Sequence, residues 1–405
     1  MQNKKLLALA VGAALVSPQW CFAKGGGASE ADSVVELYGR LYPELVREKG
    51  KGATDVGAAV STLSAAPTGK TSIIERNEME SSNSRLGVRG HERLGPHMKA
   101  IFQLETVFLP DSNTSAFAQR DSFVGLADDR WGTIKLGRMD TPFKNYGDDL
   151  SFLGVSSGNF VSSSNVLRKT GFGSSSASSF HLRRANVVQY ESPEIGGFDG
   201  ALQYSTDETD TATRKPHVWS GAVKWEGGPF VVSLAHEIHW DLFGGSRNVP
   251  SSQSNFADQS VRSKDKATQG MVQVKLGHHT IEADLIQKEY NENASVTGRF
   301  SNYKNTAWEI ALDSRWNAQW RTALEYIKSN KGTCSRVNAE CNTDGLDGSQ
   351  VQFGVAYYFS KKSYLFAMGA LLRNGFSATY NNSASQAPSV GEDIQQWAFG
   401  MSHSF

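Results

Sequence analysis

Few residues in this chain have types and spacings that could form a catalytic centre. Residues 154–158 (GVSSG) match the G-x-S-x-G pattern, in which a strand–turn–helix context exposes a nucleophilic serine. The surrounding stretch is rich in serine and lacks that context, so serine catalysis is not expected. His236 and His239 could suggest a metal site, but an odd separation along a strand places them on opposite faces, and the H-E-x-x-H zinc pattern is not met. We therefore expect no catalytic residues, no metal ligands and no cofactor.

The first residues have the pattern of a secretory signal peptide. Lys4 and Lys5 precede the apolar run Leu6–Val16, and Pro18 breaks that run shortly before Ala23. The pattern predicts a signal peptide over residues 1–23 and a mature chain over residues 24–405. The mature chain would then fold outside the cytoplasm.

Two of the three cysteines, Cys334 and Cys341, lie seven positions apart in a stretch rich in Gly, Asn and Asp. An exported chain meets an oxidising compartment, so this pair predicts a disulfide that pins one surface loop. The alternative is half of a metal site. It lacks neighbouring His or Cys ligands and is not favoured.

Composition excludes several classes of protein. The 405 residues carry 41 basic and 41 acidic side chains, so the net charge gives no attraction to nucleic acid. With 21 Phe, 9 Trp and 12 Tyr the chain is too aromatic to be disordered. The longest apolar run has eleven residues, whereas a membrane-spanning helix needs about 20.

The remaining sequence alternates apolar with polar or small residues, which is the period of a β-strand. Near the C-terminus, Trp397, Phe399 and Met401 share one face, while Ala398 and Gly400 share the other. Sixteen such segments are expected, at residues 33–47, 83–93, 97–108, 119–128, 131–139, 183–192, 199–206, 217–227, 229–240, 268–277, 279–290, 305–317, 319–329, 349–360, 363–373 and 393–405.

The connections between these segments alternate between short turns and long loops. That alternation, an even strand count and about ten residues per strand predict an all-β protein, a 16-stranded antiparallel transmembrane β-barrel of the bacterial outer membrane. The loop at residues 140–182 has no segment that alternates long enough to be a strand, and connections of that length are usually functional. The residues alone leave open whether it is a mobile external loop or folds into the lumen.

Several motifs resemble those of the general porins from neisserial and burkholderial bacteria. They are residues 83–90 (NSRLGVRG), 99–105 (KAIFQLE), 120–126 (RDSFVGL), 132–138 (GTIKLGR) and 183–193 (RRANVVQYESP). The resemblance is dense over residues 33–45 and 83–204, and from 205 to 392 it rests on the strand pattern only. Two loops depart from the family pattern: the first loop, 48–82, and the Ser-rich loop at residues 140–182. These departures leave pore size and ion preference open.

This resemblance implies a homotrimer of 16-stranded barrels, each with a water-filled pore and with the third loop, residues 140–182, folded inward. It also implies that Phe405 is the signal that the barrel-assembly machinery reads. The expected partners are outer-membrane lipid, lipopolysaccharide, and small hydrophilic solutes and ions, with no nucleic acid.

Alternation also assigns charged side chains to the inner face of the barrel. Those expected there are Arg40, Arg85, Arg89, Lys99, Glu105, Lys135 and Arg183. Arg138 falls on the lipid face by strict alternation, but a bulge or bend next to the loop could turn it inward, and the resemblance supports a pore-lining arginine there. A charge at the lipid midplane would cost roughly 2–4 kcal/mol.

The expected constriction sets Arg85, Arg138 and Arg183 on a basic wall opposite Asp148 and Asp149 of the loop. Opposed charges create a transverse field, and pore arginines favour anions, so we expect a weak to moderate anion preference. The main functional prediction is a general diffusion porin. A substrate-selective channel of the same fold is the alternative, and an outer-membrane barrel enzyme or an adhesive barrel is less favoured.

Overall fold

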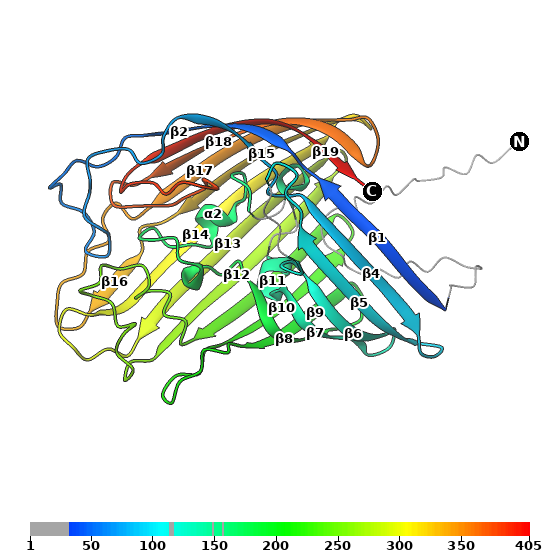
Figure 1. The fold of residues 1–405 in the computed structure, drawn as a ribbon, viewed down its shortest axis with the longest axis horizontal. Coiled ribbons are helices and arrows are strands. Elements are labelled where there is room, and N and C mark those ends of the chain that lie inside the picture. The colour runs from blue at the N-terminus through cyan, green and yellow to red at the C-terminus, as the bar shows by residue number, and fades with distance from the viewer. Residues whose placement is uncertain (1–31, 113–116, 148–149, 156–157) are drawn as a thin grey trace, which may run out of the picture.

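The computed structural model describes residues 32–112, 117–147, 150–155 and 158–405, and its architecture is a closed β-barrel (Figure 1). The predicted signal peptide, residues 1–23, and the predicted pore residues Asp148 and Asp149 lie outside the described residues. The strands are β1 Ser33–Leu41, β2 Glu44–Lys51, β3 Arg76–Glu80, β4 Arg85–Arg93, β5 Met98–Val107, β6 Ser122–Asp128, β7 Gly132–Asp140, β8 Arg183–Glu191, β9 Phe198–Thr206, β10 His217–Gly227, β11 Phe230–Trp240, β12 Ser263–Leu276, β13 His279–Glu292, β14 Phe300–Arg315, β15 Trp320–Ser329, β16 Thr333–Arg336, β17 Gly348–Tyr358, β18 Ser363–Asn374 and β19 Asp393–Ser404.

These segments build sixteen wall strands, as the sequence predicts. β1 and β2 form one wall strand that is interrupted at Tyr42 and Pro43, and β3 and β4 form the next one. Proline has no N–H to give to a ladder, which accounts for the interruption in the first strand. The short β16 pairs only with β14 and belongs to a loop. β19 pairs with β1 and β2, and this closes the barrel.

Several wall strands reach further toward the long loops than the sequence pattern predicts. β12 begins at Ser263 instead of residue 268, and β14 begins at Phe300 instead of residue 305. The outward positions in these extensions are charged, as at Lys266 and Lys304, so the alternation of apolar with polar residues fades there. Hydrogen bonding continues across the extensions because charge does not disturb a backbone ladder.

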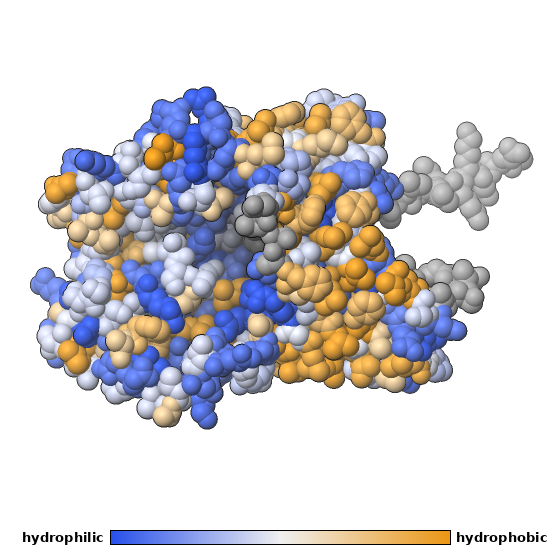
Figure 2. All heavy atoms as spheres, in the orientation of Figure 1, coloured by the Kyte–Doolittle hydropathy of each residue, from blue (hydrophilic) through white to orange (hydrophobic). Residues whose placement is uncertain are grey.

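The two faces of the wall have opposite polarity. In β11, Val232 and Leu234 are exposed on the outer face, whereas Ser233 and Glu237 are buried on the inner face. A soluble barrel would bury its apolar face, so this arrangement fits a wall surrounded by lipid. Figure 2 shows hydrophobic residues gathered over β1, β4 and β5, and hydrophilic residues toward the end of the molecule that carries the long loops.

Four short helical turns follow β7. They are α1 Pro142–Tyr146, η1 Phe152–Gly154, α2 Ser164–Leu167 and η2 Ser176–Ser178. α1 starts at Pro142, and the Thr141 hydroxyl accepts a hydrogen bond from the Lys144 amide, which caps the first turn. Within the described residues, none of the helices is long and apolar enough to cross a bilayer.

Candidate functional site

The segment 141–182 is bound to the inner, polar face of the wall. The Phe143 amide donates to the Ser220 hydroxyl at 3.0 Å, and the Gln352 amide nitrogen donates to the Val161 carbonyl at 2.6 Å. Ser220 and Gln352 are both buried on the face opposite the exposed apolar side chains. In Figure 1, α2 accordingly appears within the outline of the barrel.

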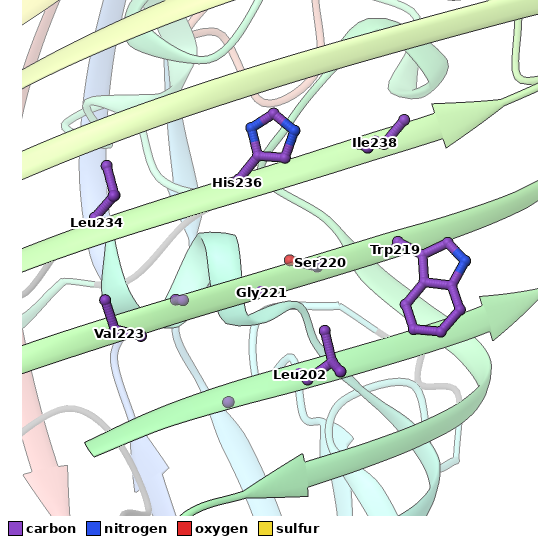
Figure 3. A pocket seen from close by; sticks show the side chains of 10 residues that line it. Leu202, Trp219, Ser220, Gly221, Val223, Leu234, His236 and Ile238 are labelled. Carbon is purple, nitrogen blue, oxygen red and sulfur yellow. The ribbon is translucent and has the colours of Figure 1, made fainter. Parts of the chain in front are cut away.

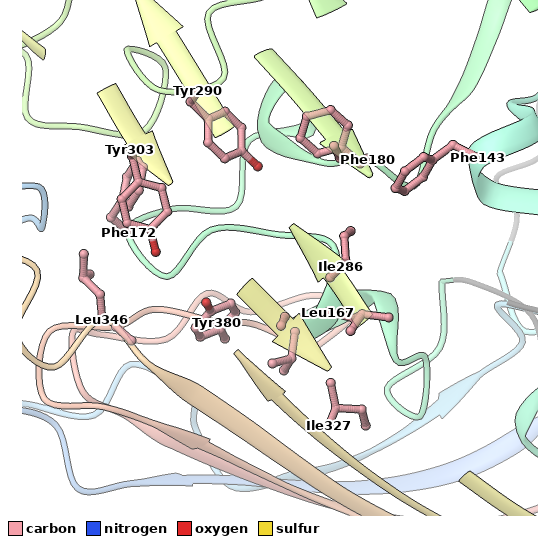
Figure 4. Packing of buried hydrophobic residues seen from close by; sticks show 14 of the residues in the cluster. Phe143, Leu167, Phe172, Phe180, Ile286, Tyr290, Tyr303, Ile327, Leu346 and Tyr380 are labelled. Carbon is pink, nitrogen blue, oxygen red and sulfur yellow. The ribbon is translucent and has the colours of Figure 1, made fainter. Parts of the chain in front are cut away.

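An apolar cluster joins this segment to one side of the barrel (Figure 4). Phe180 packs against Tyr290 of β13 with ring centroids 5.7 Å apart, and Phe172 packs edge-on against Tyr303 of β14 at 4.9 Å. Leu346, from the loop after β16, belongs to the same cluster. Aromatic pairs at these distances are favourable. The segment therefore fills the inner space next to β10–β17.

Two arginines hold the turn η1. Arg40 of β1 donates to the Gly154 carbonyl at 2.7 Å and to the Ser402 hydroxyl at 3.0 Å, and Arg321 of β15 donates to the Ser151 carbonyl at 3.4 Å. Arg40 lies on the inner face, as expected, but it is buried. Its contacts make it an anchor of the segment and not a water-exposed charge.

The opposite side of the interior carries an ion-pair cluster on β4–β8. Arg183 lies 2.6 Å from Asp121 and 2.9 Å from Asp140. Glu105 forms ion pairs with Arg120 and, at 3.7 Å, with Arg85. Two of the three arginines expected on the basic wall, Arg85 and Arg183, thus lie in this cluster.

Comparison with known proteins identifies the family. The Gram-negative porin family model matches residues 13–377. The chain belongs to this family. Over 315 residues it is 25% identical to the major outer membrane protein P.IB of Neisseria gonorrhoeae, covering 76% of this chain and 84% of that one. Over 250 residues it is 32% identical to outer membrane porin protein 32 of Delftia acidovorans, covering 60% of this chain and 62% of that one.

Solved structures show the same fold. An anion-selective porin from Comamonas acidovorans aligns with a TM-score of 0.66 at 20% identity, covering 92% of this chain and 100% of that one. The trimer form of OmpT, an outer membrane protein of Vibrio cholerae, aligns with a TM-score of 0.61 at 15% identity, covering 92% of this chain and 99% of that one. The protein is thus an outer-membrane porin, a channel and not an enzyme.

Sequence reasoning missed the partners of the porin's arginines. Arg120, Asp121 and Asp140 were not expected at the site, although Arg120 and Asp121 open one of the motifs that carry the family resemblance. Lys144 of α1 lies 2.9 Å from Asp140 and joins the same cluster. Burial lowers the pKa of Lys144, although the negative charge of Asp140 acts to raise it.

Within the described residues Arg138 forms no ion pair with this cluster, although it lies near enough to Arg183, Asp121 and Asp140 to interact with their charges. The pairing of β7 with β8 is irregular between Gly137 and Met139, so a bulge lies next to Arg138. The register with β6 stays regular, however, and pairs Arg138 with Ser122 in step with the outward Leu136. The Arg138 guanidinium donates to the Gln119 carbonyl at 2.9 Å at the rim. Its inward orientation stays a prediction.

The remaining expected inner charges of the porin also have partners. Arg89 lies 2.8 Å from Glu36, and Lys135 lies 2.7 Å from Glu191. Lys99 is half-buried on β5. The first two pairs are nearer the short turns, outside the central cluster of Arg85 and Arg183.

An acidic group on the segment's side of the barrel was also missed. Glu282 and Asp284 of β13 and Glu309 of β14 have carboxylate oxygens within 4.8 Å of one another, and all three side chains are buried. The Leu150 amide, one residue after the undescribed Asp149, donates to Glu282 at 3.3 Å. The signal was available, because alternation places Glu282 and Asp284 on one face of one strand.

The structure places only part of the two patterns that could suggest a catalytic or metal site. Residues 156 and 157 of the GVSSG motif lie outside the described residues. His236 and His239 do lie on opposite faces. His239 is buried and stacks on Phe180 at 4.5 Å, whereas His236 lines a groove of about 430 Å³ on the outer wall, beside Trp219 and Leu234 (Figure 3). This groove opens toward lipid and is unrelated to the ion-pair cluster.

The predicted disulfide is confirmed. Cys334 and Cys341 are bonded, with their Cα atoms 5.7 Å apart. At the other end of the barrel, the backbone of Phe405 pairs with Gly39 through hydrogen bonds of 3.1 and 3.3 Å. The terminal residue therefore belongs to the seam that closes the wall.

Proposed function

We propose that this porin conducts through a water-filled path between the segment 141–182 and the ion-pair cluster on β4–β8, with a weak to moderate preference for anions. The observation that carries this proposal is a contrast in exposure. The side chains of Arg85 and Arg183 are 22% and 16% exposed, whereas Lys288 and Gln352, on the wall that the segment covers, are 0% exposed. Water therefore reaches the arginine side.

The charge balance of the ion-pair cluster on β4–β8 supports an anion preference and indicates that this preference is small. The basic members of the cluster are Arg85, Arg120, Lys144 and Arg183, and the acidic members are Glu105, Asp121 and Asp140. Four cations against three carboxylates leave a small positive excess. Fixed positive charge on a pore wall attracts anions and repels cations.

A transverse field across the path follows if acidic groups line the segment. Asp148 and Asp149 remain the proposed source of that charge. Glu282, Asp284 and Glu309 lie on the same side of the barrel, but beneath the segment. A solute with a dipole would align between the two sides, whereas an apolar solute would have to displace ordered water.

The test is the reversal potential of the purified protein in a planar bilayer under a salt gradient. An anion-side reversal that moves toward zero in Arg85→Ala and Arg183→Ala variants would support the proposal, and Arg138→Ala tests the third arginine. A cation-side reversal would assign control to Asp148 and Asp149. Absence of conductance would refute an open pore.

A substrate-selective channel is the second candidate, because outer loops are tied together above the segment. The Ser61 amide donates to the Ser377 hydroxyl at 2.8 Å, the Thr62 amide donates to the Asn342 carbonyl at 3.1 Å, and the Thr379 amide donates to the Gly171 carbonyl at 2.8 Å. Such bracing restricts entry. Saturable uptake of a single solute, which a diffusion pore would not give, would favour this candidate.

We infer further that the mature chain is residues 24–405, that it assembles as a homotrimer, that Phe405 is read by the barrel-assembly machinery, and that lipopolysaccharide surrounds the wall. The trimer form of OmpT and the exposed apolar wall support this assembly. Cross-linking of intact outer membranes should give a species of three chains, and Phe405→Ala should reduce the folded amount.

A further inference from the structure

The outer face of the wall carries basic side chains at one end of several neighbouring strands. We call Lys264, Lys266, Lys304, Lys328 and Arg373 the basic rim. All five lie near the long-loop ends of β12, β14, β15 and β18. In an outer-membrane barrel the long loops face the cell exterior and the short turns face the periplasm.

Alternation places the basic rim on the lipid side. In β12, Lys266 is in step with the exposed Val272, and in β14, Lys304 is in step with the exposed Ile310 and Leu312. In β15, Lys328 is in step with the exposed Leu324 in the same way. The rim is therefore on the face that the bilayer covers and does not line the lumen.

Strand pairing brings these side chains into rows. Lys266 pairs with Glu289, which pairs in turn with Lys304 on its other side. Lys328 and Arg373 both pair with Ser349 between them. The basic residues of each row are two strands apart, about 9–10 Å at the backbone, and their long side chains can span that distance to bind one ligand together.

Local carboxylates do not neutralise the first row. Lys266 lies 3.1 Å from Glu289, so one carboxylate sits between two lysines. Within the described residues, neither Lys264 nor Lys304 lies within ion-pair distance of a carboxylate, and the Lys264 ammonium instead lies 5.2 Å from the Trp240 ring centre. The row keeps a positive excess.

The opposite end of the wall is different. Outward positions next to the short turns carry exposed aromatic and aliphatic side chains, among them Phe230, Leu276, Trp316 and Trp320. Aromatic residues belong at either membrane interface, whereas a basic belt at only one of them indicates a leaflet with anionic headgroups.

We propose that the basic rim binds the phosphate groups of lipid A in the outer leaflet, with Lys264, Lys266 and Lys304 as its centre. Lysine stems extend along the apolar wall while their ammonium groups reach the headgroup level. Each lysine near an anionic surface changes affinity about five-fold. The inference rests on the outer-membrane location and deepens the lipopolysaccharide contact proposed above, but it does not depend on the pore.

The test uses the full mature protein, purified in its native oligomeric state, with lipid A carrying both phosphates as the probe. Binding is measured by titration calorimetry and by native mass spectrometry. The test variant combines Lys264→Gln, Lys266→Gln and Lys304→Gln. The matched control combines Lys275→Gln, Lys361→Gln and Lys362→Gln, which removes the same charge near the short turns.

The rim variant should bind lipid A at least tenfold more weakly than wild type, and the control should stay within twofold. Arginine at the same three positions should restore binding, which separates loss of charge from loss of folding. Lipid A without phosphates should bind the wild type at least tenfold more weakly, and 10 mM inorganic phosphate should not displace the intact lipid.

Equal weakening in the rim and control variants, or equal binding of dephosphorylated lipid A, would overturn the proposal, as would failure of the wild type to bind. Displacement by inorganic phosphate would identify a free-anion site instead. Conductance of the rim variant should match wild type, because the rim faces away from the lumen. If the protein does not conduct but shows this binding pattern, the proposal of an open pore is refuted and the proposal of a lipid A site at the basic rim stands.

Discussion

The ammonium nitrogen of Lys288 lies 2.7 Å from the carbonyl oxygen of Leu167, the last residue of α2. It donates a second hydrogen bond of 2.7 Å to the Lys169 carbonyl. The wall strand β13 thereby binds the inner segment at the end of a helical turn, where carbonyl oxygens lack partners and attract positive charge. Lys288 is fully buried, so the contact is shielded from solvent.

Replacing Lys288 with Met should loosen the segment while leaving the barrel closed. The change removes both donors and leaves two buried carbonyls without them, at a cost of about 1–3 kcal/mol for an unsatisfied group. We expect larger current fluctuations and a higher mean conductance in single-channel recordings. Lys275→Met, a change near a short turn, should leave the current as in wild type. Identical recordings for both variants would show that the anchor does not restrain the segment.

Replacing Arg183 with Gln should shift selectivity more than the loss of one charge suggests. Arg183 pairs with both Asp121 and Asp140, so within the described residues the variant leaves Lys144 as the one direct ion-pair partner of these two carboxylates. The reversal potential should move toward the cation side, and the anion-to-cation permeability ratio should fall several-fold.

The control for this change is Arg130→Gln. Arg130 is an exposed turn residue that lies 3.0 Å from Asp128, so the same charge is lost away from the proposed path. Its reversal potential should equal that of the wild type. An equal shift in both variants would assign selectivity to the overall surface charge and not to the cluster.

Acid should weaken the packing of the inner segment through His181. Its Nδ1 lies 3.2 Å from the Arg168 guanidinium, which can only donate, so Nδ1 accepts and the ring is neutral. Burial, followed by Lys144, Arg168 and Lys169, holds the pKa of His181 well below its ordinary value. The unfolded chain binds a proton below about pH 6.5 while the folded ring does not, so stability falls as pH decreases through that value.

At pH 5 this effect reaches at most about 2 kcal/mol, because each pH unit below 6.5 contributes about 1.4 kcal/mol. Current fluctuations should therefore grow between pH 7.5 and pH 5. His181→Gln keeps an acceptor for Arg168 but does not titrate, and its fluctuations should be independent of pH over this range. A variant that responds to acid as the wild type does would refute the role of His181.

Sequence predicts the wall well and the interior poorly, for a physical reason. Alternation is a local signal, so it yields sixteen strands and the opposite faces of His236 and His239 without any tertiary information. It fails at the outer ends of β12 and β14, where Lys266 and Lys304 replace apolar residues on the lipid face. The ladder persists there because backbone hydrogen bonds do not depend on side-chain polarity.

Ion pairing inside the barrel joins residues that are distant in sequence. Arg183 meets Asp121 and Asp140 from positions 62 and 43 residues away, and no periodic pattern connects them. The sequence pattern also does not reveal which inner side chains are buried. Arg40 was expected as a wall charge, but the turn η1 covers it, and only the folded path of the segment decides which inner side chains keep contact with water.

The disulfide should stabilise the outer loops and not the wall. The bond between Cys334 and Cys341 closes a short loop, for which chain entropy gives about 2–3 kcal/mol. The Thr62 hydroxyl donates to the Cys341 sulfur at 3.6 Å, and the Thr62 amide donates to the neighbouring Asn342 carbonyl at 3.1 Å. The bonded loop thus supports the loop at residues 52–75 above the barrel.

Replacing Cys334 and Cys341 with Ser should therefore raise amide exchange at Thr62 and Leu346 by at least tenfold while the protection of β12–β14 stays unchanged. Treating the wild type with a thiol reductant should reproduce this pattern. Thr62→Val keeps the disulfide but removes the hydroxyl contact, so exchange should rise in the loop 52–75 and not at Leu346. If exchange rises equally across β12–β14 in the serine variant, the disulfide stabilises the whole barrel, and the outer loops are not a separate unit.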